Sequence, residues 1–195
     1  MTAPALLVGL FVGGQGKRMG GVAKGALRAP GSELSLVERL LVELRAALPG
    51  AAIALVGSAE AYEDLRLQTI ADDPPEIGPL GGLASLLAEA QSRGARHVIA
   101  LACDLPRLDR SLLVRLASEA PDAAVVLVEQ AETRNPLIAR YAVTAAQPAV
   151  ASALRQGRRS LQAVLDRLEP GVVALQLNAE EAGRLDDWDT PSDVR

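Results

Sequence analysis

The chain has 195 residues, of which 49% are hydrophobic and 23% charged, and its net charge at pH 7 is −4. These values predict one domain spanning residues 1–195, which buries roughly 70% of the surface of the unfolded chain, and they exclude a disordered chain or a coiled coil. The acidic balance and the low aromatic content, one Phe, one Trp and two Tyr, argue against nucleic acid as a partner.

The chain holds one cysteine, Cys103, so no intrachain disulfide can form, which favours a reducing compartment. The apolar run at residues 3–12 has no basic flank and no small-residue cleavage site after it, so it does not fit a signal peptide. No stretch reaches the ~20 apolar residues of a membrane span. We therefore expect a soluble, cytoplasmic protein that does not bind a membrane.

Short apolar runs, which predict strands, alternate with segments in which apolar residues recur at helical spacing. In chain order they are strand 5–12, helix 36–48, strand 52–56, helix 59–67, strand 68–71, helix 80–93, strand 97–103, helix 112–120, strands 123–128 and 136–141, helices 145–155 and 161–168, and strand 172–177. Ser35 is a candidate cap of the first helix. This alternation predicts an α/β fold, a Rossmann-like three-layer sandwich with a mostly parallel central sheet.

A glycine-rich, basic segment follows the first strand and reads Gly13-Gly14-Gln15-Gly16-Lys17-Arg18-Met19-Gly20-Gly21-Val22-Ala23-Lys24. Glycines let backbone amides face a bound anion with no Cβ in the way. Lys17, Arg18 and Lys24 add three cations within eight positions, which suits a polyphosphate. The alternative is a flexible basic loop with no ligand.

Two common phosphate-binding patterns do not fit this segment. A Walker A loop needs a hydroxyl residue where Arg18 stands. The dinucleotide fingerprint meets Met19 at its third glycine, which leaves the looser spacing Gly14, Gly16 and Gly20, and the second strand ends without a carboxylate for the ribose. A dehydrogenase that uses NADP is therefore a minor alternative, which binding of NADPH would favour.

Asp104 follows the apolar strand at residues 97–103. Ligands of open α/β sheets bind outside the carboxyl ends of the strands, so Asp104 is expected to face the same crevice as the glycine segment. A carboxylate beside a polyphosphate is suited to hold Mg²⁺. The alternative is that Asp104 caps the next helix. Cys103 beside it is predicted to be a small buried residue and not a nucleophile.

Asp72 and Asp73 precede a turn formed by Gly78, Pro79 and Leu80. A carboxylate and a glycine turn before a helix could bind a ribose and the edge of a base. The alternative is a connection rich in proline and glycine that only caps the helix.

In their order and spacing these segments resemble the nucleotidyltransferases of molybdenum cofactor synthesis, within the nucleoside-triphosphate transferase superfamily. The residues that carry the resemblance are Phe11-Val12-Gly13-Gly14, Arg18-Met19-Gly20-Gly21, Lys24, Gly78-Pro79-Leu80, Cys103-Asp104-Leu105-Pro106 and Asp189-Thr190-Pro191-Ser192-Asp193. The resemblance spans nearly the whole chain and implies a fold like that of the nucleotide-diphospho-sugar transferases. The paired glycines after Met19 and the Gly78-Pro79-Leu80 turn look more like the guanylyltransferase branch than the cytidylyltransferase branch.

The resemblance implies transfer of GMP from GTP to the phosphate of molybdopterin, with release of pyrophosphate and Mg²⁺ as cofactor. It implies Lys24, Arg18 and Asp104 as catalytic residues, and Asp104 and Asp189 as metal ligands. The nucleotide-binding residues that it implies are Val12, Gly13, Gly14, Gln15, Gly16, Lys17, Arg18, Lys24, Asp72, Asp73, Gly78, Pro79, Leu80 and Asp104. Contacts with cofactor-delivery proteins, and a monomer or weak homo-oligomer, are also expected.

Two departures from the family pattern keep alternatives open. Asn135 stands where a histidine is common, and Asp189 stands where the guanylyltransferases commonly carry an asparagine. A CTP-dependent molybdopterin cytidylyltransferase, another small-molecule nucleotidyltransferase, or a non-catalytic nucleotide-binding protein of the same fold are therefore the alternatives. Contacts with the acceptor are expected at Asn135, Arg134, Arg158 and Arg159.

Overall fold

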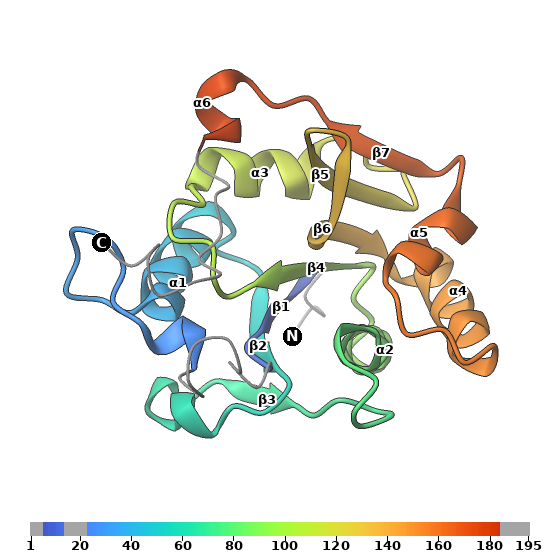
Figure 1. Cartoon of the computed structure of the whole chain (residues 1–195), viewed down its shortest axis with the longest axis horizontal. Coiled ribbons are helices and arrows are strands. Elements are labelled where there is room, and N and C mark those ends of the chain that lie inside the picture. Colours follow the sequence, from blue (N-terminus) through green and yellow to red (C-terminus); the bar gives the residue numbers. More distant parts are fainter. Residues whose placement is uncertain (1–5, 14–22, 184–195) are drawn as a thin grey trace.

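A computed structural model describes residues 6–13 and 23–183, which fold around a seven-stranded sheet of order β3-β2-β1-β4-β6-β5-β7 (Figure 1). The strands are β1 (Leu6–Phe11), β2 (Ala52–Val56), β3 (Gln68–Ile70), β4 (His97–Ala102), β5 (Val125–Gln130), β6 (Thr133–Ala142) and β7 (Val172–Leu175). Each strand predicted from an apolar run is present. The α/β architecture with a mostly parallel sheet is confirmed.

β6 is the antiparallel member of the sheet and pairs with β4 on one side and β5 on the other. The reason is its connection to β5, a hairpin whose two turn residues, Ala131 and Glu132, both have positive φ (48° and 62°). Such a short turn joins antiparallel neighbours, whereas parallel strands need a crossover. In the sequence, the antiparallel direction of β6 is indicated by the lack of a predicted helix between these two strands.

The helices are α1 (Leu36–Ala47), α2 (Pro79–Ser92), α3 (Arg110–Ser118), α4 (Val143–Arg155), α5 (Gln162–Leu168) and α6 (Ala179–Ala182), with 3₁₀ turns η2 (Lys24–Ala26) and η3 (Glu60–Leu65). Each predicted helix is present, although the one expected at residues 59–67 is the 3₁₀ turn η3. The short elements η2 and α6 escaped prediction. Asp109, and not Asp104, caps α3, because its side chain accepts a hydrogen bond from the amide of Leu112.

Helices cover both faces of the sheet and complete three layers (Figure 1). Side chains alternate between the two faces along a strand, so Leu7 of β1 belongs to the core cluster that includes residues of α2, α4 and α5, whereas Val8 belongs to the cluster on the other face, with residues of α1 and α3. Ser35 caps α1 as expected and forms a reciprocal capping box with Glu38. The helices of the described residues all lack the length and hydrophobicity of a membrane-spanning segment.

Candidate functional site

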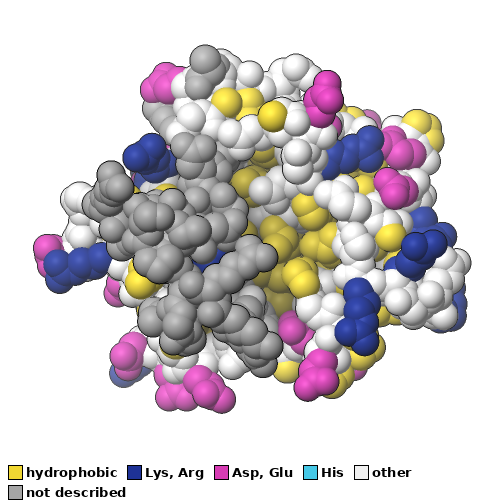
Figure 2. Space-filling view, viewed as in Figure 1, with side chains coloured by type: hydrophobic (Ala, Val, Ile, Leu, Met, Phe, Trp, Pro, Cys, Tyr) yellow, Lys and Arg dark blue, Asp and Glu magenta, His cyan; other side chains and the backbone are white. Residues whose placement is uncertain are grey.

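A cavity of about 400 Å³ lies at the carboxyl ends of β1, β2 and β4, beside the first residues of α2. This is the edge where ligands of open α/β sheets bind. The residues that line the cavity are Phe11, Val12, Gly13, Lys24, Val56, Ser58, Asp72, Gly78, Pro79, Ala102, Cys103, Asp104 and Leu137. Figure 2 looks onto this edge of the sheet and shows hydrophobic side chains gathered in a hollow near its middle.

Lys24 and Asp104 meet in this cavity. The Lys24 Nζ lies 3.0 Å from Asp104 Oδ2, and the two side chains are 22% and 18% exposed. Lys24 is the first residue of η2, and Asp104 lies two residues beyond the end of β4. The structure therefore brings together Lys24, which is predicted to bind the phosphates, and Asp104, which is predicted to bind the metal ion.

The first residues after β1 continue the backbone ladder of the sheet. The amides of Val12 and Gly13 both donate to the carbonyl of Val56, at 3.0 and 3.3 Å. These two N–H groups are therefore engaged within the fold, and any backbone donors to an anion must come from later residues of the segment. The predicted residues Gly14, Gln15, Gly16, Lys17 and Arg18 lie outside the described residues, as does Asp189.

Asp72, and not its neighbour, is the carboxylate that faces the cavity. Ala71 alone separates Asp72 from the end of β3. Partial burial raises the pKa of the Asp72 carboxyl above its ordinary value. A Cβ added at Gly82 would lie 2.9 Å from Asp72 Oδ1, so the carboxylate rests against the first turns of α2. Asp73 is not among the described residues that line the cavity, and its backbone amide donates to Ser85 Oγ.

The turn before α2 presents two of its three predicted residues to the cavity. Gly78 is the N-cap of α2 with φ of 78°, a conformation that glycine adopts at little cost, and Pro79 occupies the first helical turn. Leu80 is fully buried in the core and does not line the cavity. It therefore anchors the helix, and a direct contact of its side chain with a ligand is not supported.

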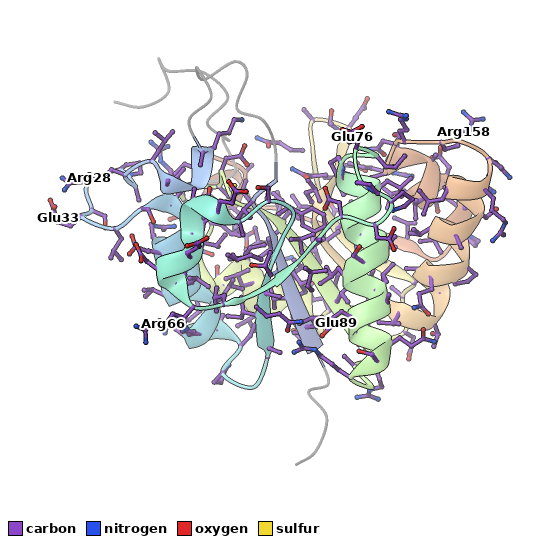
Figure 3. The ribbon with its side chains drawn as sticks, turned by 90° about the horizontal axis from the view of Figure 1, so that it is seen from below. Arg28, Glu33, Arg66, Glu76, Glu89 and Arg158 are labelled. Carbon is purple, nitrogen blue, oxygen red and sulfur yellow. The ribbon has the colours of Figure 1, made fainter. Side chains whose placement is uncertain are left out.

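The residues expected on the acceptor side lie farther out. Arg134 pairs with Glu169 at 2.6 Å, and the Asn135 side chain accepts from the amide of Leu137 at 3.0 Å. Both border a smaller, separate cavity along β6. Arg158 follows α4 and projects at the same edge of the molecule as Glu76 in the turn before α2 (Figure 3). Arg159 next to it is also exposed.

Cys103 lines the cavity but is suited to packing. Burial raises the pKa of its thiol to about 12, and the charge of Asp104 adds to the rise. A thiol that stays protonated at neutral pH is a poor nucleophile. The prediction that Cys103 is a buried structural residue therefore agrees with its environment.

Ser58, Val56, Ala102 and Leu137 line the cavity although they were not predicted site residues. For Ser58 a usable signal existed, because it follows the carboxyl end of β2, the rule that identified Asp104. Leu137 comes from the antiparallel strand β6, which that rule does not cover. Within the described residues no group of three or more His, Cys, Asp or Glu is placed to hold a metal ion, and the carboxylates among those that line the cavity are Asp104 and Asp72.

Comparison with known proteins identifies the family. A family profile described as MobA-like NTP transferase domain matches residues 9–172. The molybdenum cofactor guanylyltransferase of Pseudomonas fluorescens is 34% identical over 186 residues, covering 93% of this chain and 88% of its own. A probable molybdenum cofactor guanylyltransferase of Opitutus terrae is 32% identical over 197 residues, covering 98% and 94%.

Solved structures share the fold at lower identity. Molybdopterin-guanine dinucleotide biosynthesis protein A from Archaeoglobus fulgidus has a TM-score of 0.73 at 23% identity, covering 96% of this chain and 94% of its own. The 2-C-methyl-D-erythritol 4-phosphate cytidylyltransferase of Thermus thermophilus has a TM-score of 0.62 at 18% identity, covering 95% and 94%. From the profile and the relatives, the chain belongs to the MobA-like NTP transferase family and is a nucleotidyltransferase.

Proposed function

We propose that the chain transfers GMP from GTP to the phosphate of molybdopterin and releases pyrophosphate, with Mg²⁺ as the cofactor. The observation that carries this proposal is the Lys24–Asp104 pair in a cavity of about 400 Å³, a size within the usual range for small-molecule sites. The names of the relatives supply the nucleotide and the acceptor, because both of those reported above are called guanylyltransferases of the molybdenum cofactor.

The donor set at Asp104 suits Mg²⁺, which prefers carboxylate oxygens and keeps several waters. Asp104 would hold it, with Asp189 as the proposed second ligand. When bound there, Mg²⁺ would neutralise negative charge on the phosphate oxygens. Lys24 lies beside the same position, so its ammonium would donate to the α-phosphoryl oxygens as charge shifts during attack. Lys17 and Arg18 are the proposed partners of the other two phosphates.

The far wall of the cavity suits the nucleoside. Asp72 presents carboxylate oxygens that can accept hydrogen bonds from ribose hydroxyls. Gly78 and Pro79 bring the backbone at the start of α2 to the cavity, where its polar groups can meet the edge of a base. The apolar side chains of Phe11 and Val56 between them can pack against the ring.

The reaction needs no general base in this arrangement. An oxygen of the acceptor phosphate attacks the α-phosphorus, and the bond from that phosphorus to the oxygen bridging to the β-phosphorus breaks. The attacking phosphate is already ionised at neutral pH, so catalysis amounts to positioning and charge neutralisation. For the acceptor side we propose the exposed Arg158 and Arg159, rather than Arg134, which pairs with Glu169.

Thermal stabilisation by GTP, CTP, ATP and NADPH, each with and without Mg²⁺, tests the proposal. A ligand at ~100 times its Kd adds about 2.7 kcal/mol of stability, a shift of a few degrees for a chain of this size. We expect GTP with Mg²⁺ to give the largest shift, followed by turnover with molybdopterin. A shift with CTP alone would replace the proposal with the cytidylyltransferase. No shift with any nucleoside triphosphate would overturn it.

A further inference from the structure

Tyr62 is a core residue that lies behind Lys24 and Asp104, which line the cavity. It belongs to η3, and its side chain is 5% exposed. Its hydroxyl is buried and forms no hydrogen bond of ordinary geometry within residues 6–13 and 23–183, while the backbone amides of Gly25 and Ala26 face it closely enough to lower its pKa. A buried hydroxyl whose proton has no acceptor lowers the stability of a protein. Phenylalanine would fill the same space without that loss, so the hydroxyl itself has a role to explain.

The hydroxyl oxygen occupies the space between two short backbone segments. A Cβ added at Gly25 would lie 2.7 Å from Tyr62 Oη, 2.5 Å from a methyl of Val37 and 3.3 Å from the Cβ of Cys103. Gly25 does not have positive φ, so close packing, and not backbone conformation, requires a glycine here. The oxygen therefore sets how closely η2 can approach the end of β4.

Each of these two segments carries one member of the ion pair. Gly25 directly follows Lys24, and Cys103 directly precedes Asp104. Burial, with smaller contributions from the charges of Cys103 and Asp104, outweighs the lowering effect of the Gly25 and Ala26 amides and raises the pKa of Tyr62 to about 12. The phenol is therefore neutral at pH 7, so the oxygen acts through its size and position and not through a charge.

We propose that Tyr62 is a positioning residue whose hydroxyl spaces η2 from β4 and so holds Lys24 at its distance from Asp104. The inference rests on the proposed function, because that function gives the spacing of this pair its purpose. Without the oxygen, Gly25 can move toward Cys103, and Lys24 moves with it. A displacement of about 1 Å in a substrate-positioning group can cost on the order of 100-fold in rate.

Tyr62→Phe tests this inference, since it removes the oxygen and nothing else. We expect kcat for GMP transfer to fall about tenfold, with the melting temperature unchanged or higher. A merely structural role would give the opposite pattern, a lower melting temperature with normal kcat in the folded protein. That pattern would overturn the inference.

A measurement without ligand separates this inference from the proposed function. Lys17 and Lys24 are the lysines of the chain, so mass spectrometry after brief acylation gives the reactivity of Lys24 relative to Lys17. We expect Tyr62→Phe to raise this ratio toward that of Asp104→Asn, in which the ion pair is lost. A raised ratio in a protein that binds no GTP would support the role of Tyr62 and contradict the proposed function. An unchanged ratio together with unchanged kcat would overturn the role of Tyr62 while the proposed function stands.

Gly25→Ala provides the complementary change, because its methyl group collides with Tyr62 Oη. In Gly25→Ala/Tyr62→Phe the methyl takes the place of the lost oxygen, while its 2.5 Å approach to a methyl of Val37 remains. We expect the double variant to recover part of the kcat lost by Gly25→Ala. A double variant as impaired as the two single changes combined would count against the spacing role.

Tyr141→Phe is the matched control. Tyr141 is a buried tyrosine like Tyr62, but its hydroxyl donates to the carbonyl of Pro136 at 2.8 Å. Loss of that oxygen leaves the carbonyl unpaired, so we expect a lower melting temperature and an unchanged acylation ratio for Lys24. A ratio raised as much as in Tyr62→Phe would show a general loosening and would overturn the inference.

Discussion

The ammonium nitrogen of Lys24 lies 3.0 Å from a carboxylate oxygen of Asp104, although 80 positions separate the two residues in the chain. They meet because β1 and β4 are parallel neighbours in the sheet, so the segments that follow these strands emerge at the same edge. In the absence of a ligand each charge partly neutralises the other. A bound polyphosphate would give Lys24 a new anionic partner, and a cation bound with it would give Asp104 a new cationic partner.

Lys24→Met and Asp104→Asn are expected to abolish most of the activity while sparing the fold. Removing one group that stabilises charge in a transition state typically lowers kcat by roughly 100-fold or more. The pair is partly exposed, at 22% and 18%, so its loss should reduce the free energy of unfolding by about 1 kcal/mol or less. Urea unfolding and steady-state kinetics measure the two effects.

Arg28→Met is the control for these two variants. Arg28 and Glu33 form an ion pair at 2.7 Å whose side chains are highly exposed, at the outer end of a loop away from the cavity (Figure 3). Its loss should leave both kcat and the unfolding midpoint within error of the starting protein. If Lys24→Met or Asp104→Asn simply unfolded the chain, the pair would be structural and the assignment of the site would be wrong.

Asp72→Asn is expected to stabilise the free protein and weaken its hold on the nucleotide. Burial raises the pKa of Asp72, so its neutral form is favoured in the fold, and that favourable contribution is lost as the pH rises through the raised pKa. At pH 7 the charged carboxylate therefore costs stability, and asparagine relieves that cost. We expect a higher melting temperature and a KM for GTP raised about tenfold, as for one lost hydrogen bond to a charged group.

Asp73→Asn separates the two carboxylates, because Asp73 does not line the cavity in the part of the chain that the structure describes. Its KM for GTP should match that of the starting protein. A larger effect at Asp73 than at Asp72 would reverse the assignment.

The sequence was sufficient for the order of strands and helices, because buried parallel strands have continuous apolar runs. It also placed Asp104 and Lys24 at one edge of the sheet, since the ends of parallel strands follow a general rule. The pairing of these two side chains was not predictable, because it depends on how η2 packs, and η2 is a single 3₁₀ turn without a periodic signal. The role of Tyr62 was not predictable either, because it depends on the contact of Tyr62 with Gly25 of the same turn.

The choice between Asp72 and Asp73 shows another limit of sequence reasoning. Both residues follow β3 and both carry a carboxylate, so composition and spacing treat them alike. The difference arises from tertiary contacts: Ser85 of α2 accepts a hydrogen bond from the Asp73 amide, while the glycines of α2 leave room for the Asp72 side chain. A contact between distant segments cannot be read from a local pattern.

Gly57→Ala is expected to destabilise the protein through the backbone that borders the cavity. Gly57 has φ of 98°, and a Cβ there would lie 2.8 Å from the Cα of Gly13. A strained backbone conformation costs of order 1–3 kcal/mol, and the collision with another backbone adds to it. We therefore expect the free energy of unfolding to fall by about 2 kcal/mol or more, measured by urea denaturation, together with weaker binding of GTP.

Gly50→Ala is its control, because a Cβ at Gly50 has nothing within 4 Å and the residue does not have positive φ. Its stability should stay the same or rise by about 0.4–1 kcal/mol, through loss of freedom in the unfolded chain. Equal losses in Gly57→Ala and Gly50→Ala would contradict the role given to the close approach of Gly57 and Gly13.

Glu181→Gln is expected to lower stability at neutral pH but not in acid. Arg115 donates to both carboxylate oxygens of Glu181, at 2.7 and 2.8 Å, and ties α6 to α3. These hydrogen bonds, with a further one from the amide of Asn178, hold the pKa of Glu181 below its ordinary value of 4.5. A carboxyl with a lowered pKa in the folded state stabilises the fold above its unfolded pKa, and this contribution is lost as the pH falls through the folded pKa.

At pH 7 the free energy of unfolding, measured in urea, should therefore be about 1–2 kcal/mol lower for Glu181→Gln than for the starting protein. The two free energies should converge as the pH falls below 4.5. Glu63→Gln, a change at an exposed residue of η3, should stay within about 0.5 kcal/mol at both pH values. A gap between Glu181→Gln and the starting protein that persists at low pH would mean that the amide disturbs packing and that the charge of Glu181 is not what holds α6 in place.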